Sequence, residues 1–350
     1  MLSAVSTSTL FAGPRNAVTT LQAKLSEAET EQSTGMLADP IKSLGSQIGL
    51  DETLRSQAAS LANMQSANNI VDTTLTVSQN ALSSVSSDAQ TFLNSIVSAQ
   101  NTGDVRTLQT QAKSLLDSFT STLNTVSAGA YVFGGTNSSV APMANYSGAP
   151  QTATAAAFTN LVNQQTPPQA SSISSADMTS FLSSGAFANL FADPLQAGST
   201  WTANWSQASS TGTSAVISQG QTVPTGVSAN EKAFRQLASA YTSIAGLDLT
   251  SLNSSTQQTV LTSALEQVGY AMQGISDMQT TLGLSQSQLT KTNSALQTQA
   301  STVNNMVSQL DGIDPYQAAT ALTDLTTQLE TAYSLTNQIS KLGLVNYLPA

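Results

Sequence analysis

Two long stretches of heptad periodicity, one in each half of the chain, constrain the fold more than any other feature. From Leu54 to Ile96 every seventh residue is apolar except Asn68, and the same spacing from Leu261 to Leu310 contains no polar residue. Apolar residues at this spacing line one side of an α-helix and pair with a second helix in a coiled coil. The seam residues expected to be buried are Leu54, Leu61, Leu75, Leu82, Leu261, Val268, Ile275 and Leu282.

Shorter apolar stripes flank these heptads at both ends of the chain. Asp314 and Pro315 form a helix start, and Gly35 interrupts the N-terminal stripe. A pair of such helices leaves much apolar surface open, so we expect residues 1–45 and 306–350 to be disordered in the monomer and to order against neighbouring copies. The candidate assembly interface consists of Leu21, Leu25, Leu322, Leu325, Leu329, Ile339 and Leu342.

The middle of the chain has a different character. Between 118 and 230 the only charged residues are Asp177 and Asp193, and glycines and prolines cluster among short β-prone pieces at 131–133, 201–205 and 215–217. We expect a β-rich insertion domain at 136–228, and a coiled-coil helical core with a β-hairpin at 46–135 and 229–305. The predicted fold class is therefore mainly α with a small β-rich insertion, the long N- and C-terminal helices forming an antiparallel coiled-coil bundle.

Composition excludes several kinds of function. The chain of 350 residues has no His and no Cys, so metal sites, disulfides and His-dependent triads are not expected, and no cofactor is predicted. A net charge of −10 with ten scattered basic residues disfavours nucleic acid. No apolar run is long enough for a membrane span, and the N-terminus lacks a Sec signal pattern. Asp177 and Asp193 are isolated, so we expect no enzyme activity.

The polar residues are mostly neutral. Charged residues make 9% of the chain, against about a quarter in ordinary domains, and more than two-fifths is Ser, Thr, Asn and Gln. A surface that becomes covered in an assembly tolerates neutral polar groups better than unpaired ions. Compositional drift in an exposed polymer is the other explanation of the same bias.

Five segments resemble the bacterial flagellin superfamily and, within it, the type-three hook-associated proteins of the hook–filament junction. They are EQSTG at 31–35, GAYVFGGTN at 129–137, LGLSQSQL at 282–289, DGIDPYQAATAL at 311–322 and LGLVNYL at 342–348. The last is more similar to junction proteins than to filament flagellins. WTANW at 201–205 and NEKAFR at 230–235 look most like the junction proteins of rhizobia and their alphaproteobacterial relatives.

The resemblance implies a structural protein of the extracellular flagellum, with a flagellin-like fold, exported through the flagellar type III apparatus by an unstructured, uncleaved signal at its N-terminus. It also implies four partners: the other hook-associated junction protein, flagellin, copies of itself and a cytoplasmic export chaperone. Two alternatives stay open. One is a flagellin that forms the bulk filament, and the other is a secreted coiled-coil adhesin that uses the insertion.

Overall fold

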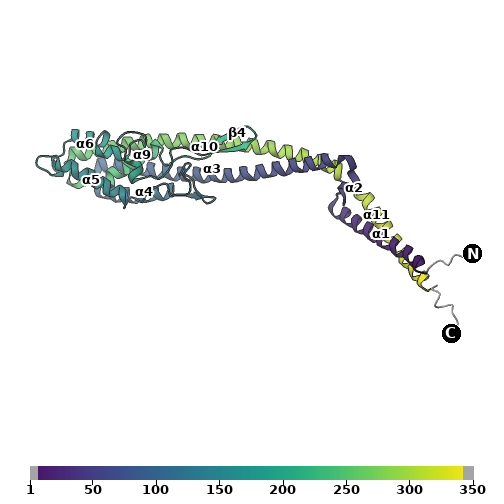
Figure 1. The fold of residues 1–350 in the computed structure, drawn as a ribbon. Helices are drawn as coiled ribbons and strands as arrows, with labels where there is room; N and C mark the ends of the chain where they lie inside the picture. Colours follow the sequence, from purple (N-terminus) through teal and green to yellow (C-terminus); the bar gives the residue numbers. More distant parts are fainter. Residues whose placement is uncertain (1–6, 342–350) are drawn as a thin grey trace, which may run out of the picture. The chain divides into compact units, whose positions relative to one another are not determined.

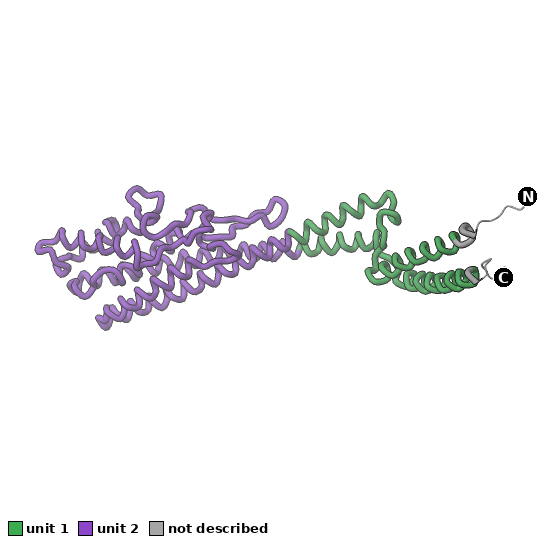
Figure 2. Tube along the Cα trace, turned by 60° about the horizontal axis from the view of Figure 1, so that its bottom comes forward, with its two compact units in different colours: residues 1–63, 295–350 green, residues 64–294 purple. Residues whose placement is uncertain are grey.

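A computed structural model describes residues 7–341 and confirms the predicted fold class, since the protein is mainly helical with two short β-hairpins. The chain divides into two compact units (Figure 2). Unit 1 contains residues 1–63 and 295–350, and unit 2 contains residues 64–294. The division falls within the two longest helices and differs from the three regions expected from the sequence. In particular, the insertion belongs to the same unit as the helices that carry it.

The two longest helices, α3 (Ile48–Thr102) and α10 (Ser254–Asp311), run side by side (Figure 1). In unit 2 the Gln79 side-chain amide donates to the Gln279 carbonyl oxygen at 2.7 Å, and Gln286 donates to Thr76 at 3.2 Å. From the first contact to the second, the residue number falls along α3 and rises along α10, so the two helices are antiparallel. All eight predicted seam residues are buried, with exposed fractions from 0% to 9%.

Two further helices, α4 (Val105–Leu123) and α9 (Lys232–Gly246), pack against each other in unit 2. Aromatic rings fill the space between the helices. The Tyr241 ring lies 4.9 Å from Phe92 and 6.1 Å from Phe119, and the Phe234 ring lies 6.2 Å from Phe119. α9 is buried around most of its circumference, so it is a central helix of this unit.

The insertion contains more helix than its sequence predicts. Helices α5 (Ala149–Asn163), α6 (Ser175–Ser183), α7 (Ala186–Leu190) and α8 (Trp201–Asn204) lie within 136–228. The strands here form a hairpin of β3 (Ser214–Ser218) and β4 (Gln221–Pro224), which includes the β-prone piece at 215–217, and an isolated β-bridge joins Met143 to Ser206. A second hairpin, β1 (Val126–Ser127) with β2 (Ala130–Tyr131), precedes the insertion and includes only Tyr131 of the piece at 131–133.

The expected β-prone piece at 201–205 is instead a helical turn. Trp201 and Trp205 are four residues apart, so a helical turn places both indoles on one side, where they stack with ring centroids 5.7 Å apart. Both are fully buried, and Trp201 Nε1 donates to Asn230 Oδ1 at 2.7 Å. Tertiary packing of the two indoles therefore overrides the local β propensity, and both tryptophans serve core packing.

Unit 1 is built from the ends of the chain. α1 (Thr7–Thr34) stops where Gly35 adopts φ 70°, a left-handed conformation that favours glycine. A short helix α2 (Pro40–Leu44), capped by Asp39, and a 3-10 turn η1 (Gly45–Gln47) lead into α3. α11 (Pro315–Lys341) begins as predicted, with Asp314 accepting a hydrogen bond from the Tyr316 N–H at 2.8 Å. Residues 7–10, near the N-terminus, belong to the first turns of α1.

Candidate assembly surfaces

The terminal helices α1 and α11 pack side by side along unit 1 (Figure 1). Ala28 and Ala318 are buried in the pair, and Gln22 donates to the Tyr333 hydroxyl at 2.6 Å. The predicted interface residues within the described side chains are all half-buried; they are Leu21, Leu25, Leu322, Leu325, Leu329 and Ile339. Leu342 lies outside the described residues. Two helices thus cover only part of each apolar stripe.

Large apolar and aromatic side chains of α11 are also exposed to solvent. Tyr316 is 86% exposed, Leu335 52% and Tyr333 48%. Single exposed apolar residues are ordinary on a protein surface. Here they accompany half-buried stripes on the same two helices, so the pair presents apolar area that a further helix could cover.

The threonines of α11 satisfy their own hydroxyls. Each of six donates to the carbonyl oxygen four residues earlier, at 2.7–3.0 Å; they are Thr320, Thr323, Thr326, Thr327, Thr331 and Thr336. A buried donor without a partner costs about 1–3 kcal/mol. Because these donors already have partners inside the helix, a neighbouring helix can cover them without that cost. This geometry gives the neutral polar composition a physical role.

The turns after α1 and α10 are joined by a short antiparallel β-bridge. The Leu37 N–H donates to the Asp311 carbonyl at 2.9 Å, and the Ile313 N–H donates to the Gly35 carbonyl at 3.1 Å. We call residues 35–37 and 311–313 the clasp. The clasp joins the turn after α1 to the turn after α10. The end of α1 and the start of α11 therefore lie close together.

An ionic cluster beside the clasp was not foreseen from the sequence. Arg55 Nε donates to Asp51 Oδ2 at 2.7 Å, and its Nη2 pairs with Asp311 Oδ2. The hydrogen bond to Asp51 raises the pKa of the Arg55 guanidinium. Both carboxylates are buried, with exposed fractions of 2% and 1%, and the Oδ1 atom of each has no hydrogen-bond partner. Two buried anions therefore depend on one cation.

A polar layer interrupts the seam between α3 and α10 in unit 2. Asn68, the one polar member of its heptad series, is 1% exposed and donates to Asn293 Oδ1 at 2.8 Å and to the Ile217 carbonyl at 2.9 Å. Thr292 donates to Gln221 Oε1 at 3.0 Å. The β3–β4 hairpin thus covers the polar layer and supplies part of its hydrogen bonding, which fixes the register of the two helices.

The two insertion carboxylates have structural roles. Asp193 Oδ2 accepts from Arg235 Nη2 at 2.9 Å, and burial lowers the pKa of this Arg235. Arg235 also donates to the Phe191 carbonyl at 2.9 Å, so it ties α9 to the insertion. Asp177 accepts from the Ser174 hydroxyl at 2.7 Å at the start of α6. The two aspartates therefore belong to separate local contacts.

Residues 7–341 contain no group of three or more acidic side chains arranged to hold a metal ion. No helix in the same range is long and apolar enough to cross a membrane.

Comparison with known proteins gives the family. The model of the bacterial flagellin N-terminal helical region matches residues 5–138, and that of the C-terminal helical region matches residues 265–348. Together these matches cover more than half of the chain. The chain belongs to the bacterial flagellin family. As a flagellin-family protein it is an extracellular structural component of the flagellum.

Among solved structures, a flagellar hook-associated protein described from Vibrio parahaemolyticus is similar to this flagellin-family chain. The identity is 14% and the TM-score 0.53, over 77% of this chain and 99% of that chain. At this identity the likeness concerns the fold alone. No curated protein matches the chain significantly.

Proposed function

We propose that the chain is a type-three hook-associated protein (FlgL) that joins the hook side of the flagellum to the flagellin filament. Family membership supports a flagellar building part, and the half-buried stripes of α1 and α11 support axial packing against neighbours. The resemblance of residues 342–348 to junction proteins carries the finer assignment; these residues lie outside the described range. The partners would be the other hook-associated junction protein, flagellin and copies of this chain. An export chaperone would cover the α11 stripe in the cytoplasm.

Bulk filament flagellin is the second candidate, because the matched family models describe flagellin helical regions. Deleting the gene from its source bacterium separates the two. A junction protein predicts cells with hooks but no filaments, with flagellin of another gene lost to the medium. A filament protein predicts heavy bands of 36.1 kDa in sheared filaments. Normal filaments in the deletion strain would contradict both candidates.

Complementation of the deletion strain tests the packing surface. Leu335 is 52% exposed on α11, so Leu335→Gln removes apolar contact area without opening the monomer core. We expect fewer filaments per cell than with the unaltered chain. Val216→Gln is the matched control, because Val216 is 68% exposed on β3 in unit 2. Equal filament numbers for both variants would contradict a packing role for this face of α11.

The expected disorder of the termini in the monomer is tested by hydrogen exchange. We expect fast exchange in α1 and α11, and slow exchange along the heptad helices α3 and α10. Protection of 322–339 in a monomer equal to that of α3 would contradict ordering coupled to assembly.

A further inference from the structure

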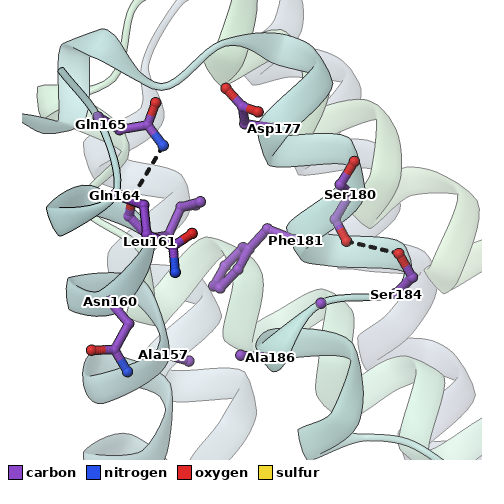
Figure 3. Close-up of a pocket in the computed structure, with 11 residues that line it drawn as sticks. Ala157, Asn160, Leu161, Gln164, Gln165, Asp177, Ser180, Phe181, Ser184 and Ala186 are labelled. Atoms are coloured by element: carbon purple, nitrogen blue, oxygen red, sulfur yellow. Dashed lines mark hydrogen bonds between the residues drawn. The ribbon is translucent and has the colours of Figure 1, made fainter.

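A cleft in the insertion lies between the C-terminal half of α5 and the α6–α7 corner (Figure 3). Its volume is about 290 Å³. The floor is apolar and buried, formed by Ala157, Leu161 and Phe181. Phe181 reaches from α6 towards α5, as Figure 3 shows. The cleft plays no part in the assembly argument above, so its role is independent of the proposed function.

Gly185 shapes the corner where α6 ends and α7 begins. A Cβ atom at this position would lie 2.8 Å from Phe181 Cα and 3.2 Å from the Ser180 carbonyl oxygen. A larger residue would therefore push this segment away from α6. The close approach holds the start of α7 against the floor of the cleft.

The rim of the cleft carries neutral hydrogen-bonding groups. Asn160 and Gln164 are exposed, and within the described part of the chain their side-chain amides make no hydrogen bond. Each amide offers two donors on its nitrogen and an acceptor oxygen. By contrast, Gln165 Nε2 donates to the Leu161 carbonyl at 3.1 Å. Two amides one helical turn apart are thus free to bind a ligand.

Charge narrows the class of ligand. The lining holds one carboxylate, Asp177, and no Lys or Arg. The other insertion carboxylate, Asp193, is paired with Arg235. An anion in the cleft would meet a like charge without a cation to offset it, so phosphates, sulfates and acidic sugars are disfavoured. A neutral ligand with several hydroxyls could donate hydrogen bonds to the Asp177 carboxylate. It could also donate to the amide oxygens of Asn160 and Gln164 and accept from their amide nitrogens.

The size of the cleft suits a small ligand, since its volume is near the lower limit of about 300 Å³ for small-molecule sites. An apolar floor with an aromatic ring suits the C–H face of a sugar ring, while amides and a carboxylate suit its edge hydroxyls. We propose that this cleft binds a neutral hexose. Phe181 and Leu161 contact the ring face, and Asn160, Gln164 and Asp177 bind the hydroxyls.

Saturation-transfer NMR on the full chain tests this site with the methyl glycosides of glucose, galactose and mannose. Methyl glucuronide is the anionic comparison. We expect saturation transfer to at least one neutral glycoside and at least fivefold less to the glucuronide. Absence of transfer to all three neutral glycosides would overturn the proposal, and so would equal transfer to the glucuronide.

The double variant Asn160→Ala/Gln164→Ala locates the binding. Both side chains are exposed, so the melting temperature should stay unchanged while the dissociation constant rises at least tenfold. Gln151→Ala is the matched control, because Gln151 is an exposed amide on α5 outside the cleft. Unaltered affinity in the double variant, or equal loss in the control, would overturn the assignment of this cleft. Loss of filaments in the deletion strain is a separate readout that does not depend on sugar binding.

Discussion

Replacing Arg55 by methionine tests the ionic cluster beside the clasp. Methionine keeps most of the apolar stem of the side chain and removes the guanidinium that both carboxylates contact. Asp51 and Asp311 would then be two buried anions without a cation. We expect unit 1 to lose stability locally, near the start of α3 and the end of α10.

The magnitude follows from burial. Removing one partner of a buried ion pair costs about 3–5 kcal/mol, because the other charge is left uncompensated. The Arg55 side chain is 40% exposed, so water already reaches the cation and the pair is partly screened. We therefore expect a loss of about 2–3 kcal/mol. Since about 1.4 kcal/mol is a factor of ten, the local opening equilibrium should rise about 30- to 140-fold.

Hydrogen exchange measures this opening directly at residues 51–61 and 303–311. Arg106→Met is the control, because Arg106 is exposed on α4 and forms no ion pair within residues 7–341. Adding Asp311→Asn to Arg55→Met removes one of the stranded charges and should recover part of the lost protection. Unchanged exchange in the Arg55→Met variant would refute the idea that this cation holds the two carboxylates.

Three further predictions concern unit 2. Asn68→Leu should lower the free energy of unfolding by about 1–3 kcal/mol in urea titrations, because the buried Ile217 carbonyl and the half-buried Asn293 Oδ1 lose their donor. Asn69→Leu on the exposed side should change it little. Burial raises the pKa of the Tyr146 hydroxyl from its ordinary value of about 10 to about 12. The contribution of the neutral hydroxyl to folding stability is therefore full below about pH 10 and is lost as the pH rises towards about 12. Tyr146→Phe should reduce the slope of stability against pH in this range. Gly274→Ala would place a Cβ 2.8 Å from the Ala233 Cβ and should therefore destabilise the protein. Gly269 has open space around it, so Gly269→Ala should stabilise the protein by about 0.5–1 kcal/mol. Equal melting temperatures for the two variants would contradict the crowding at Gly274.

The heptad seams and the helix ends could be predicted from the sequence because their signals are local. Periodicity places the apolar residues of α3 and α10 on one face, and Gly35 and Asp314 mark helix ends through backbone geometry and capping. These signals need no knowledge of distant partners. The eight predicted seam residues are accordingly buried.

The insertion could not be predicted as well, because its structure depends on contacts distant in sequence. Trp201 is helical since its indole stacks on Trp205 and binds Asn230. Arg235 likewise forms an ion pair with Asp193, which lies 42 residues earlier in the chain. Local β propensity and abundant Gly and Pro carried none of this information.

The ionic cluster shows the same limit. Asp51 and Arg55 stand four apart, a spacing that indicates a helix-surface pair worth little. Only the antiparallel return of the chain brings Asp311 to them, 256 positions from Arg55, and both carboxylates are buried there while the Arg55 side chain stays partly exposed. In the sequence, the four-residue spacing of Asp51 and Arg55 was the only indication of this ionic cluster.

Pairing of α1 with α11 has a consequence for folding in time. Within residues 7–341 the first and last helices contact each other, as the Gln22–Tyr333 hydrogen bond across 311 positions shows. A contact of such long range closes slowly, since the chain entropy is lost before the contact forms. A chain delivered from one end to the other exposes α1 without its partner until nearly all 350 residues have emerged. The α1–α11 pair can therefore form only after the residues of α11 have emerged.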